Sequence, residues 1–336
     1  MVREVGVSAT SHVCHAADLH RSPKDLDVDL TGRTILITGA NSGIGLAATK
    51  AFARRNASVH MLCRNEGRGA SAQTEVVQDT GNRNVHLHVV DVSEKASVDA
   101  FVSKWKGENK PIHVWVHNAG VVPKSRIETP DGLELAWATM IWGTLYAPLQ
   151  LLSQLQAGAT DTDPARVVHV CSGGMYAAYF DLDNLQSSKG EYDGTWAYAN
   201  AKRAQAELVE RLAHEWRAAG VNARINCVNP GWVDTPGLRD LDGFSSSSEL
   251  RSPEMGADSI VWLGAAPASS GVLALNGAVV MDRAAESAHT FWGDTKLSKD
   301  SKRGLWQTCL DMVGMSQSDV TGEAPAAAAA AAAEGR

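Results

Sequence analysis

The eight residues 38–45, Thr-Gly-Ala-Asn-Ser-Gly-Ile-Gly, follow the apolar run Ile35-Leu36-Ile37 directly and open a helix-like stretch at residues 46–55. This order predicts a strand, a glycine turn and a helix start. Such a turn points the first unpaired N–H groups of the helix outward, and the missing Cβ atoms let a pyrophosphate approach the backbone. A similar turn without a ligand is also common. The candidate nucleotide-binding residues of this loop are Gly39, Asn41, Ser42, Gly43, Ile44 and Gly45.

Length and charge restrict the fold and the partners. At 336 residues the chain can form one α/β domain with tails, because such domains reach about 250 residues as one unit. A net charge of −7 and a pI near 5.9 disfavour nucleic acid or an anionic membrane as a partner. We predict a small-molecule partner.

Cysteine spacing and the absence of long apolar runs indicate the compartment. The cysteines are odd in number and scattered, without the spacing of a metal site: Cys14, Cys63, Cys171, Cys227 and Cys309. We therefore expect free thiols and no metal. No apolar run reaches about 18 residues, and residues 1–30 lack the apolar core of a signal peptide. The sequence predicts a cytoplasmic protein without an integral membrane segment.

The chain divides into three segments. Residues 1–30 mix polar residues without periodicity and are predicted to be a flexible leader arm, and residues 31–314 the folded domain. Residues 315–336 contain an alanine run at 326–333 and are predicted to be a disordered tail.

Within the domain, short β-rich apolar runs alternate with amphipathic stretches, a pattern typical of a parallel sheet covered by helices on both faces. The predicted strands are residues 34–38, 58–63, 85–90, 113–117, 166–171, 223–228 and 278–281. The predicted helices are residues 43–55, 67–80, 93–106, 133–156, 198–219 and 256–265. We predict a single α/β domain with a Rossmann-type, doubly wound, seven-stranded parallel sheet. Its ligands should gather at the carboxyl ends of the strands.

Arg64 follows the second predicted strand, where a dinucleotide fold meets the adenosine ribose. A carboxylate there binds a free ribose 2′-hydroxyl and repels a 2′-phosphate, whereas a guanidinium pairs with that phosphate. Arg64 therefore favours NADP(H) over NAD(H). The alternative is a surface arginine at a helix start.

Two further strand ends carry candidate cofactor contacts. Asp91 and Val92 follow the third predicted strand, and the segment Asn118-Ala119-Gly120 follows the fourth. A short acid can accept a hydrogen bond from the adenine amino group, and Asn118-Ala119-Gly120 lets a nucleotide lie close to the backbone. Either can equally be turn chemistry, with Asp91 capping a helix and Asn118 closing a bend.

Ser172 follows the fifth predicted strand, and Tyr198 and Lys202 share one face of the next helix at i, i+4 spacing. A phenol with an ordinary pKa of about 10 is a poor acid or base at neutral pH, and a nearby ammonium lowers that pKa. Tyr198 is then a candidate proton shuttle. Ser172 can donate a hydrogen bond to a carbonyl oxygen, whose charge grows as a hydride arrives at carbon. Without this context, the pair is usually a solvated helix face.

The turn after the sixth predicted strand, residues 229–235, combines rigidity with a small hydroxyl. Thr235 can meet the nicotinamide amide or a phosphate, or it can simply cap the helix that begins at Pro236. The candidate cofactor-binding residues of this turn are Pro230, Gly231, Val233 and Thr235.

Together these residues resemble the short-chain dehydrogenase/reductase family, over roughly residues 31–314. The glycine spacing is that family's G-x-x-x-G-x-G, and the other shared features are Asn118-Ala119-Gly120, Ser172, Tyr198-x-x-x-Lys202 and Pro230-Gly231. The resemblance implies an oxidoreductase in which Tyr198 is the acid/base, Lys202 lowers its pKa and holds the nicotinamide ribose, and Ser172 positions the substrate carbonyl. Residues 181–186 form an insertion similar to the retinol-dehydrogenase-like branch, and residues 171–175, 192–195 and 230–237 resemble one group within it.

Two positions depart from this family. In the family, the helix after the fourth strand carries an asparagine three residues before a glycine. This asparagine binds a water that links the lysine to solvent. Here Met140 precedes Gly143, and a thioether cannot replace an amide in a proton relay. Three alternatives follow. Another group or a water completes the proton relay, turnover is slow, or the protein binds its cofactor without catalysing a reaction. His117 also replaces a common asparagine and is expected to be a satisfied buried histidine.

Large apolar side chains after the fifth predicted strand are candidates for lining a substrate pocket. The insertion 173–196, with Trp232 and Phe244, can line an apolar pocket or simply pack on the domain: Met175, Tyr176, Tyr179 and Phe180. Residues 238–252, rich in Ser and Gly, are predicted to be a mobile lid. We predict NADP(H)-dependent interconversion of a carbonyl and an alcohol on a small apolar substrate.

Two other functions remain open. Met140 suggests a catalytically weak NADP(H)-binding sensor or scaffold, and an NAD-dependent sugar epimerase shares the Tyr/Lys pair but usually has another glycine spacing. Helices 133–156 and 198–219 carry more apolar surface than one sheet face needs, and in this family they form a dimer interface. A homodimer is therefore a further prediction.

Overall fold

A computed structural model describes residues 23–177, 180–239, 250–290 and 295–322. The predicted leader up to residue 22, the centre of the predicted lid and the alanine run lie outside these ranges, as do Cys14, Tyr179 and Phe244.

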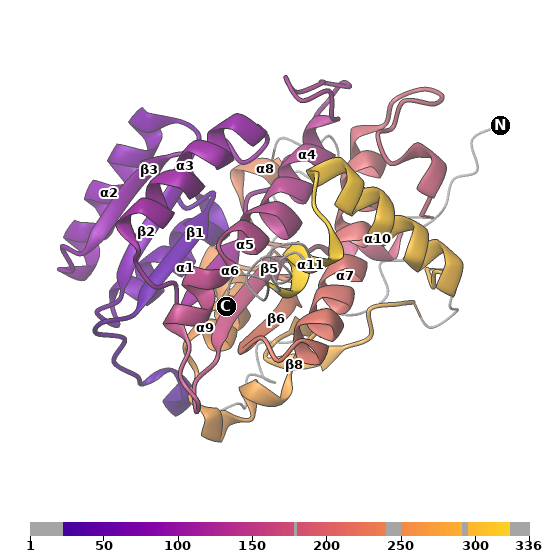
Figure 1. The fold of residues 1–336 in the computed structure, drawn as a ribbon. Coiled ribbons are helices and arrows are strands. Elements are labelled where there is room, and N and C mark those ends of the chain that lie inside the picture. The colour runs from indigo at the N-terminus through magenta and orange to yellow at the C-terminus, as the bar shows by residue number, and fades with distance from the viewer. Residues whose placement is uncertain (1–22, 178–179, 240–249, 291–294, 323–336) are drawn as a thin grey trace.

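One twisted sheet forms the centre of the domain (Figure 1). Its strands are β1 (Thr34–Thr38), β2 (Ser58–Cys63), β3 (Val85–Val89), β4 (Val114–His117), β5 (Ala165–Val170), β6 (Ala223–Val228), β7 (Val279–Met281) and β8 (Ala284–Glu286). Their order is β3-β2-β1-β4-β5-β6-β7-β8, in which the first seven are parallel and β8 runs antiparallel to β7. The doubly wound fold is confirmed. The sheet has one more strand than predicted because a tight turn at Asp282 and Arg283, both with positive φ, folds β8 back on β7.

Helices cover both faces of the sheet and divide the core into two clusters. One face carries α1 (Gly43–Ala53), α2 (Glu66–Thr80) and α9 (Pro253–Ala265), which bury Phe52, Val76 and Ile260 against the strands. The other carries α3 (Lys95–Glu108), α7 (Gly194–Ala218) and the segments α4 (Leu135–Ile141), α5 (Ala147–Gln150) and α6 (Leu152–Gly158).

The helix predicted at residues 133–156 contains a π-helical turn, η3 (Trp142–Tyr146), between α4 and α5. Pro148 lies in the first turn of α5 and has no N–H to donate, and its ring would clash with the carbonyl of Thr144 in a regular helix. A wider turn just before the proline relieves both problems, which is a common origin of π turns.

The ordered structure extends beyond the predicted domain at both ends. At residues 23–30, Leu30 is buried and Arg55 donates to the Leu26 carbonyl oxygen at 2.7 Å. At the other end, α11 (Gln317–Thr321) lies within the segment predicted to be a disordered tail. The Trp216 indole nitrogen donates to the carbonyl oxygen of Val320 at 3.0 Å, and Val320 is fully buried.

The helix α10 (Lys299–Val313) lies alongside α7, as Figure 1 shows, and buries Leu305, Cys309 and Leu310 in the core. The ion pair between Lys302 Nζ and Glu207 Oε2, at 2.9 Å, joins the two helices. The second apolar side of α7, which suggested a dimer interface, is therefore covered by α10 and α11 of the same chain.

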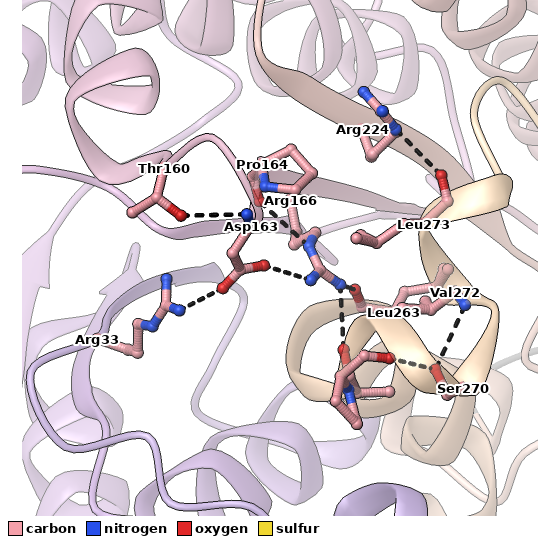
Figure 2. A network of polar contacts seen from close by, with 12 residues as sticks. Arg33, Thr160, Asp163, Pro164, Arg166, Arg224, Leu263, Ser270, Val272 and Leu273 are labelled. Atoms are coloured by element: carbon pink, nitrogen blue, oxygen red, sulfur yellow. Dashed lines mark hydrogen bonds and ion pairs between the residues drawn. The ribbon is translucent and has the colours of Figure 1, made fainter.

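A buried arginine network joins the sheet to α9 at the amino ends of the strands, opposite the predicted site (Figure 2). Arg166 of β5 is 6% exposed and donates to the carbonyl oxygens of Leu263 and Ala266, at 3.1 and 3.4 Å. It also donates to the Pro164 carbonyl oxygen at 3.2 Å and to Asp163 at 2.5 Å, and Asp163 pairs in addition with Arg33. The guanidinium thereby satisfies carbonyls that the end of a helix leaves without partners.

Candidate functional site

The glycine loop is built against the end of β4. Gly39 and Gly43 have φ of 64° and 51°, a region that favours glycine. A Cβ on Gly45 would lie 2.3 Å from the Gly39 carbonyl oxygen, so only glycine fits there. The Asn118 side-chain amide donates to the carbonyl oxygens of Thr38 and Gly39, at 3.1 and 3.2 Å. Asn118 therefore closes the loop, which is one of the two roles that the sequence predicted for it.

The N-terminus of α1 is open. Its N-cap residue, Ser42, is exposed and makes no side-chain capping hydrogen bond, so the first N–H groups of the helix keep their capacity for an anion. Thr235 lies directly beside this turn, since a Cβ on Gly43 would be 3.0 Å from Thr235 Cγ2. Thr235 Oγ1 also accepts from Leu238 N at 3.3 Å, so it caps α8 (Pro236–Arg239) as well.

Ile44 and Val233 both pack on α9 at Gly256. A Cβ there would lie 3.2 Å from Ile44 Cγ1 and 2.7 Å from Val233 Cγ2. Arg251 holds the turn before Val233. It donates to the Pro230 carbonyl oxygen at 3.1 Å, and its side chain lies close to Gly231. The structure thus brings the turn after β6 against the glycine loop.

Arg64 and Asp91 meet at the ends of β2 and β3, with Nε and Oδ2 3.6 Å apart. Arg64 is 56% exposed and immediately precedes Asn65, the N-cap of α2. Asp91 accepts from the backbone N–H and the hydroxyl of Ser93, at 2.9 and 2.6 Å, so turn chemistry is present there. Val92 beside it is buried.

Tyr198, Lys202 and Gly120 converge at the carboxyl end of β4. A Cβ on Gly120 would lie 3.6 Å from Lys202 Nζ and 3.7 Å from Tyr198 Cε2, and Nζ lies 5.7 Å from the Tyr198 ring centre. The helix α7 begins four residues earlier than predicted because Asp193 caps it by accepting from Thr195 N and Trp196 N.

The electrostatics of this group differ from the prediction. Burial raises the pKa of Tyr198 to about 12, and the hydrogen bond with Ser172 only partly opposes this. Burial also lowers the pKa of Lys202 to about 8. The pKa of the phenol is thus raised and not lowered as expected, because its removal from water is the largest cause.

Lys202 makes contacts that the sequence analysis missed. Its ammonium donates to the Val170 carbonyl oxygen at 2.6 Å and to Gln205 Oε1 at 3.1 Å. The Gln205 amide nitrogen donates in turn to Thr144 Oγ1 at 2.8 Å. Met140 is 2% exposed and packs in the apolar core. The i, i+3 spacing of Lys202 and Gln205 was the available signal.

His117 lies under the π turn, where a Cβ on Gly143 would be 2.0 Å from its ring. Its Nδ1 is 3.1 Å from Thr38 Oγ1, and a backbone hydrogen bond with Thr139 also acts on the ring. That His117 is a satisfied buried histidine stays a prediction. Burial holds its pKa well below the usual value, so the ring is neutral.

Three large side chains of the insertion that the structure describes pack on the domain, which favours the simpler of their two interpretations. Met175 is fully buried, and Tyr176 and Phe180 are half-buried against the core. The cavity that this segment lines, about 290 Å³, is polar: Asp181, Asn184, Ser187, Lys189, Glu191, Asp193 and Trp196. Trp232, by contrast, is 57% exposed at the turn after β6.

Comparison with known proteins identifies the family. Residues 33–243 match the family model described as short chain dehydrogenase. The chain is 40% identical over 251 residues to dehydrogenase/reductase SDR family member 12 of Bos taurus, covering 74% of this chain and 76% of that protein. It is 28% identical over 294 residues to retinol dehydrogenase 11 of Homo sapiens, covering 86% and 88%.

A crystal structure of an uncharacterized protein from Mycobacterium paratuberculosis has the same fold, with a TM-score of 0.66 and 21% identity over 86% of this chain and 96% of that one. The chain belongs to the short-chain dehydrogenase/reductase family, whose members are oxidoreductases acting on CH–OH and C=O groups. The group that residues 171–175, 192–195 and 230–237 resemble is that of family member 12, and this resemblance is confirmed.

In the part of the chain that the structure describes, no helix combines the length and apolar character needed to cross a bilayer.

Proposed function

We propose that the protein is an NADP(H)-dependent oxidoreductase that interconverts a carbonyl and an alcohol on a small, apolar substrate. The observation that carries this proposal is the convergence of Tyr198, Lys202 and Gly120 at the sheet edge that also holds the glycine loop. The residues present fit a dinucleotide. Gly39, Gly43 and Gly45 let the loop pack tightly against Asn118, Ala119 and Thr235, and the N–H groups at the start of α1 have no side-chain cap and can bind a pyrophosphate.

The chain's own residues supply the proton chemistry. NADPH supplies a hydride when bound. The Ser172 hydroxyl donates a hydrogen bond to the substrate carbonyl oxygen, and Tyr198 gives that oxygen its proton. With a pKa near 12 the phenol is protonated at neutral pH, which is the form that donates. Lys202 holds the nicotinamide ribose and its positive charge favours the phenolate that remains.

Arg64 supports the choice of NADP(H). Its side chain is 56% exposed, and its ion pair with Asp91 is long at 3.6 Å, so it keeps donors for a 2′-phosphate. A charge-assisted hydrogen bond of about 1.5–3 kcal/mol corresponds to a preference of roughly 10- to 150-fold.

A paired fluorescence titration with NADPH and NADH tests the cofactor. We expect the wild type to prefer NADPH and Arg64→Asp to invert that preference. The matched control is Arg83→Asp, which makes the same charge change before β3, at the opposite edge of the sheet. Equal affinities in the wild type, or an unchanged preference in Arg64→Asp, would contradict the assignment.

A panel of aldehydes, ketones and retinoids tests turnover. We expect Tyr198→Phe to lose turnover by about 100-fold or more while NADPH binding is retained. An apolar substrate is supported by exposed Trp232 near the site and by the name of the relative retinol dehydrogenase 11, because retinol is an apolar alcohol.

The second candidate function, an NADP(H)-binding sensor or scaffold, is favoured by buried Met140 at the family's asparagine position. It gains support if a cellular phenotype of the gene survives Tyr198→Phe, and it loses support if the phenotype disappears.

We also propose a cytoplasmic location, on the grounds of the free, buried thiols of Cys63, Cys171, Cys227 and Cys309, to be checked by cell fractionation. For the proposed homodimer, α10 and α11 cover the α7 surface that the family uses. A dimer on that surface therefore requires these helices to move, and sedimentation at micromolar concentration decides.

A further inference from the structure

Lys202 is held by acceptors from two sides. Its side chain is 4% exposed, and an ammonium has three N–H donors and no acceptor. One N–H is directed to the Val170 carbonyl oxygen and a second to Gln205 Oε1. The third remains for Tyr198 and the ribose side. A buried ammonium without these acceptors would carry a large desolvation penalty.

Gln205 is oriented by Thr144. Both residues are fully buried, and the Gln205 amide reaches Lys202 with its oxygen and Thr144 with its nitrogen. The opposite orientation of the amide would place N–H groups against the ammonium, so the charge of Lys202 fixes the assignment. Thr144 keeps the amide from rotating away.

The π turn places Thr144 where it can do this. Regular helical geometry would rotate the residues after Trp142 relative to α7, whereas η3 sets Gly143 over His117 and Thr144 against Gln205. Met140, one turn earlier, has only a thioether and contributes to the apolar core. The polar contact to Lys202 therefore comes from a different pair of residues.

We propose that Gln205, oriented by Thr144, is the positioning residue that holds the charged Lys202 ammonium in this chain and offsets the loss of the family's asparagine at Met140. This inference rests on the proposed NADP(H) function, because Lys202 acts there on the cofactor ribose and on Tyr198. Neither Gln205 nor Thr144 touches the reacting atoms.

Other titratable groups surround Lys202, and their titration must be distinguished from that of Lys202. They are Tyr198 on α7, Cys171 at the end of β5, Cys227 on β6, His117 on β4 and His169 on β5. Burial keeps both histidines neutral and the phenol protonated between pH 6.5 and 9.5. Cys171 is the exception, because the ordinary pKa of a thiol already lies in this range and a hydrogen bond from Cys227 lowers that of Cys171 further.

The pH dependence of NADPH affinity tests the inference without requiring turnover. Lys202 holds the ribose only while charged, so the dissociation constant of the wild type should rise above an inflection near pH 8. In Gln205→Leu the inflection should move down by about one pH unit or more, since a hydrogen bond to a charged group is lost. Affinity at pH 6.5 should change less than the affinity at pH 8.5.

Further variants complete the test. Thr144→Val should shift the inflection in the same direction by a smaller amount, and Thr144→Ser should restore it. Thr144→Val also keeps the inference testable if Gln205→Leu does not fold. Gln154→Leu removes a buried glutamine elsewhere and should leave the inflection unchanged. Cys171→Ala should keep an inflection, moved to lower pH because the charge of Cys171 raises the pKa of Lys202, whereas loss of the inflection would assign it to the thiol.

The outcomes separate the two proposals. An unshifted inflection in folded Gln205→Leu or Thr144→Val that still binds NADPH would overturn the role of Gln205 and leave the proposed function in place. If the wild type binds neither NADPH nor NADH at any pH, the proposed function fails, and this inference fails with it.

Discussion

Arg166→Met should lower the stability of the protein. The residue lies at the amino ends of the strands, on the opposite side of the sheet from the candidate site. Methionine keeps most of the length of the side chain and removes every donor. The carbonyl oxygens of Leu263 and Ala266, at the end of α9, then lose the guanidinium, as Figure 2 makes clear for Leu263. Asp163 keeps Arg33 as its remaining cation.

The expected loss follows from burial. Breaking a buried ion pair by removing one partner costs about 3–5 kcal/mol. The Asp163 side chain is 30% exposed, so solvent and Arg33 compensate part of the loss, and we expect about 3 kcal/mol. Arg166→Lys keeps the charge, but an ammonium lacks the planar fork that reaches Asp163 and both carbonyls, so about half of that loss is expected.

Urea unfolding followed by circular dichroism measures this free energy. With an m-value of about 3 kcal/mol per molar, the midpoint should fall by about 1 M. Asp163→Asn and the double variant complete a cycle, in which the double variant should lose less than the sum of the single losses. A loss below about 1 kcal/mol for Arg166→Met, or strict additivity, would refute the reasoning. NADPH affinity should remain unchanged, because the network lies at the opposite edge from the glycine loop.

Two more predictions concern pH and the carboxyl-terminal helix. Burial lowers the pKa of His60 to about 3 and that of His88 to about 4, with their rings 2.9 Å apart between Nδ1 and Nε2. The unfolded chain, with histidine pKa values near 6.5, binds more protons below that pH. Stability should therefore fall by about 1.4 kcal/mol per pH unit for each histidine as the pH decreases from 6.5 toward 4, and His88→Gln should flatten this slope in urea titrations. Trp306→Ala should cost about 3–5 kcal/mol, because Trp306 on α10 is 5% exposed, and should increase self-association in sedimentation by uncovering α7.

The strands and the doubly wound fold class could be predicted because their signals are local. Each parallel strand is a short apolar run, and the glycine spacing at residues 39–45 specifies both a tight turn and a close backbone contact. The family resemblance then placed Tyr198 and Lys202 at the same edge, and the structure has them there. Such features need no knowledge of which distant segment packs on which helix.

Features that depend on distant packing could not be predicted in this way. The apolar surface of α7 suggested a partner chain, since its pattern does not reveal whether the covering helix comes from a second copy or from residues 299–321. The strand β8 is only three residues long and depends on β7 for its hydrogen bonds. Pro148, by contrast, was a local signal for the π turn that the sequence analysis left unused.

The same distinction explains the error about Tyr198. Spacing on a helix correctly placed an ammonium near the phenol, 5.7 Å from its ring centre, but a sequence contains no measure of how far both groups are withdrawn from water. In the structure Lys202 directs its ammonium to Val170 and Gln205, while burial raises the pKa of Tyr198. A substitution that weakens the hold on Lys202 should therefore affect cofactor affinity at high pH before it affects the fold, so the Gln205→Leu titration measures the contacts of Lys202 separately from both stability and turnover.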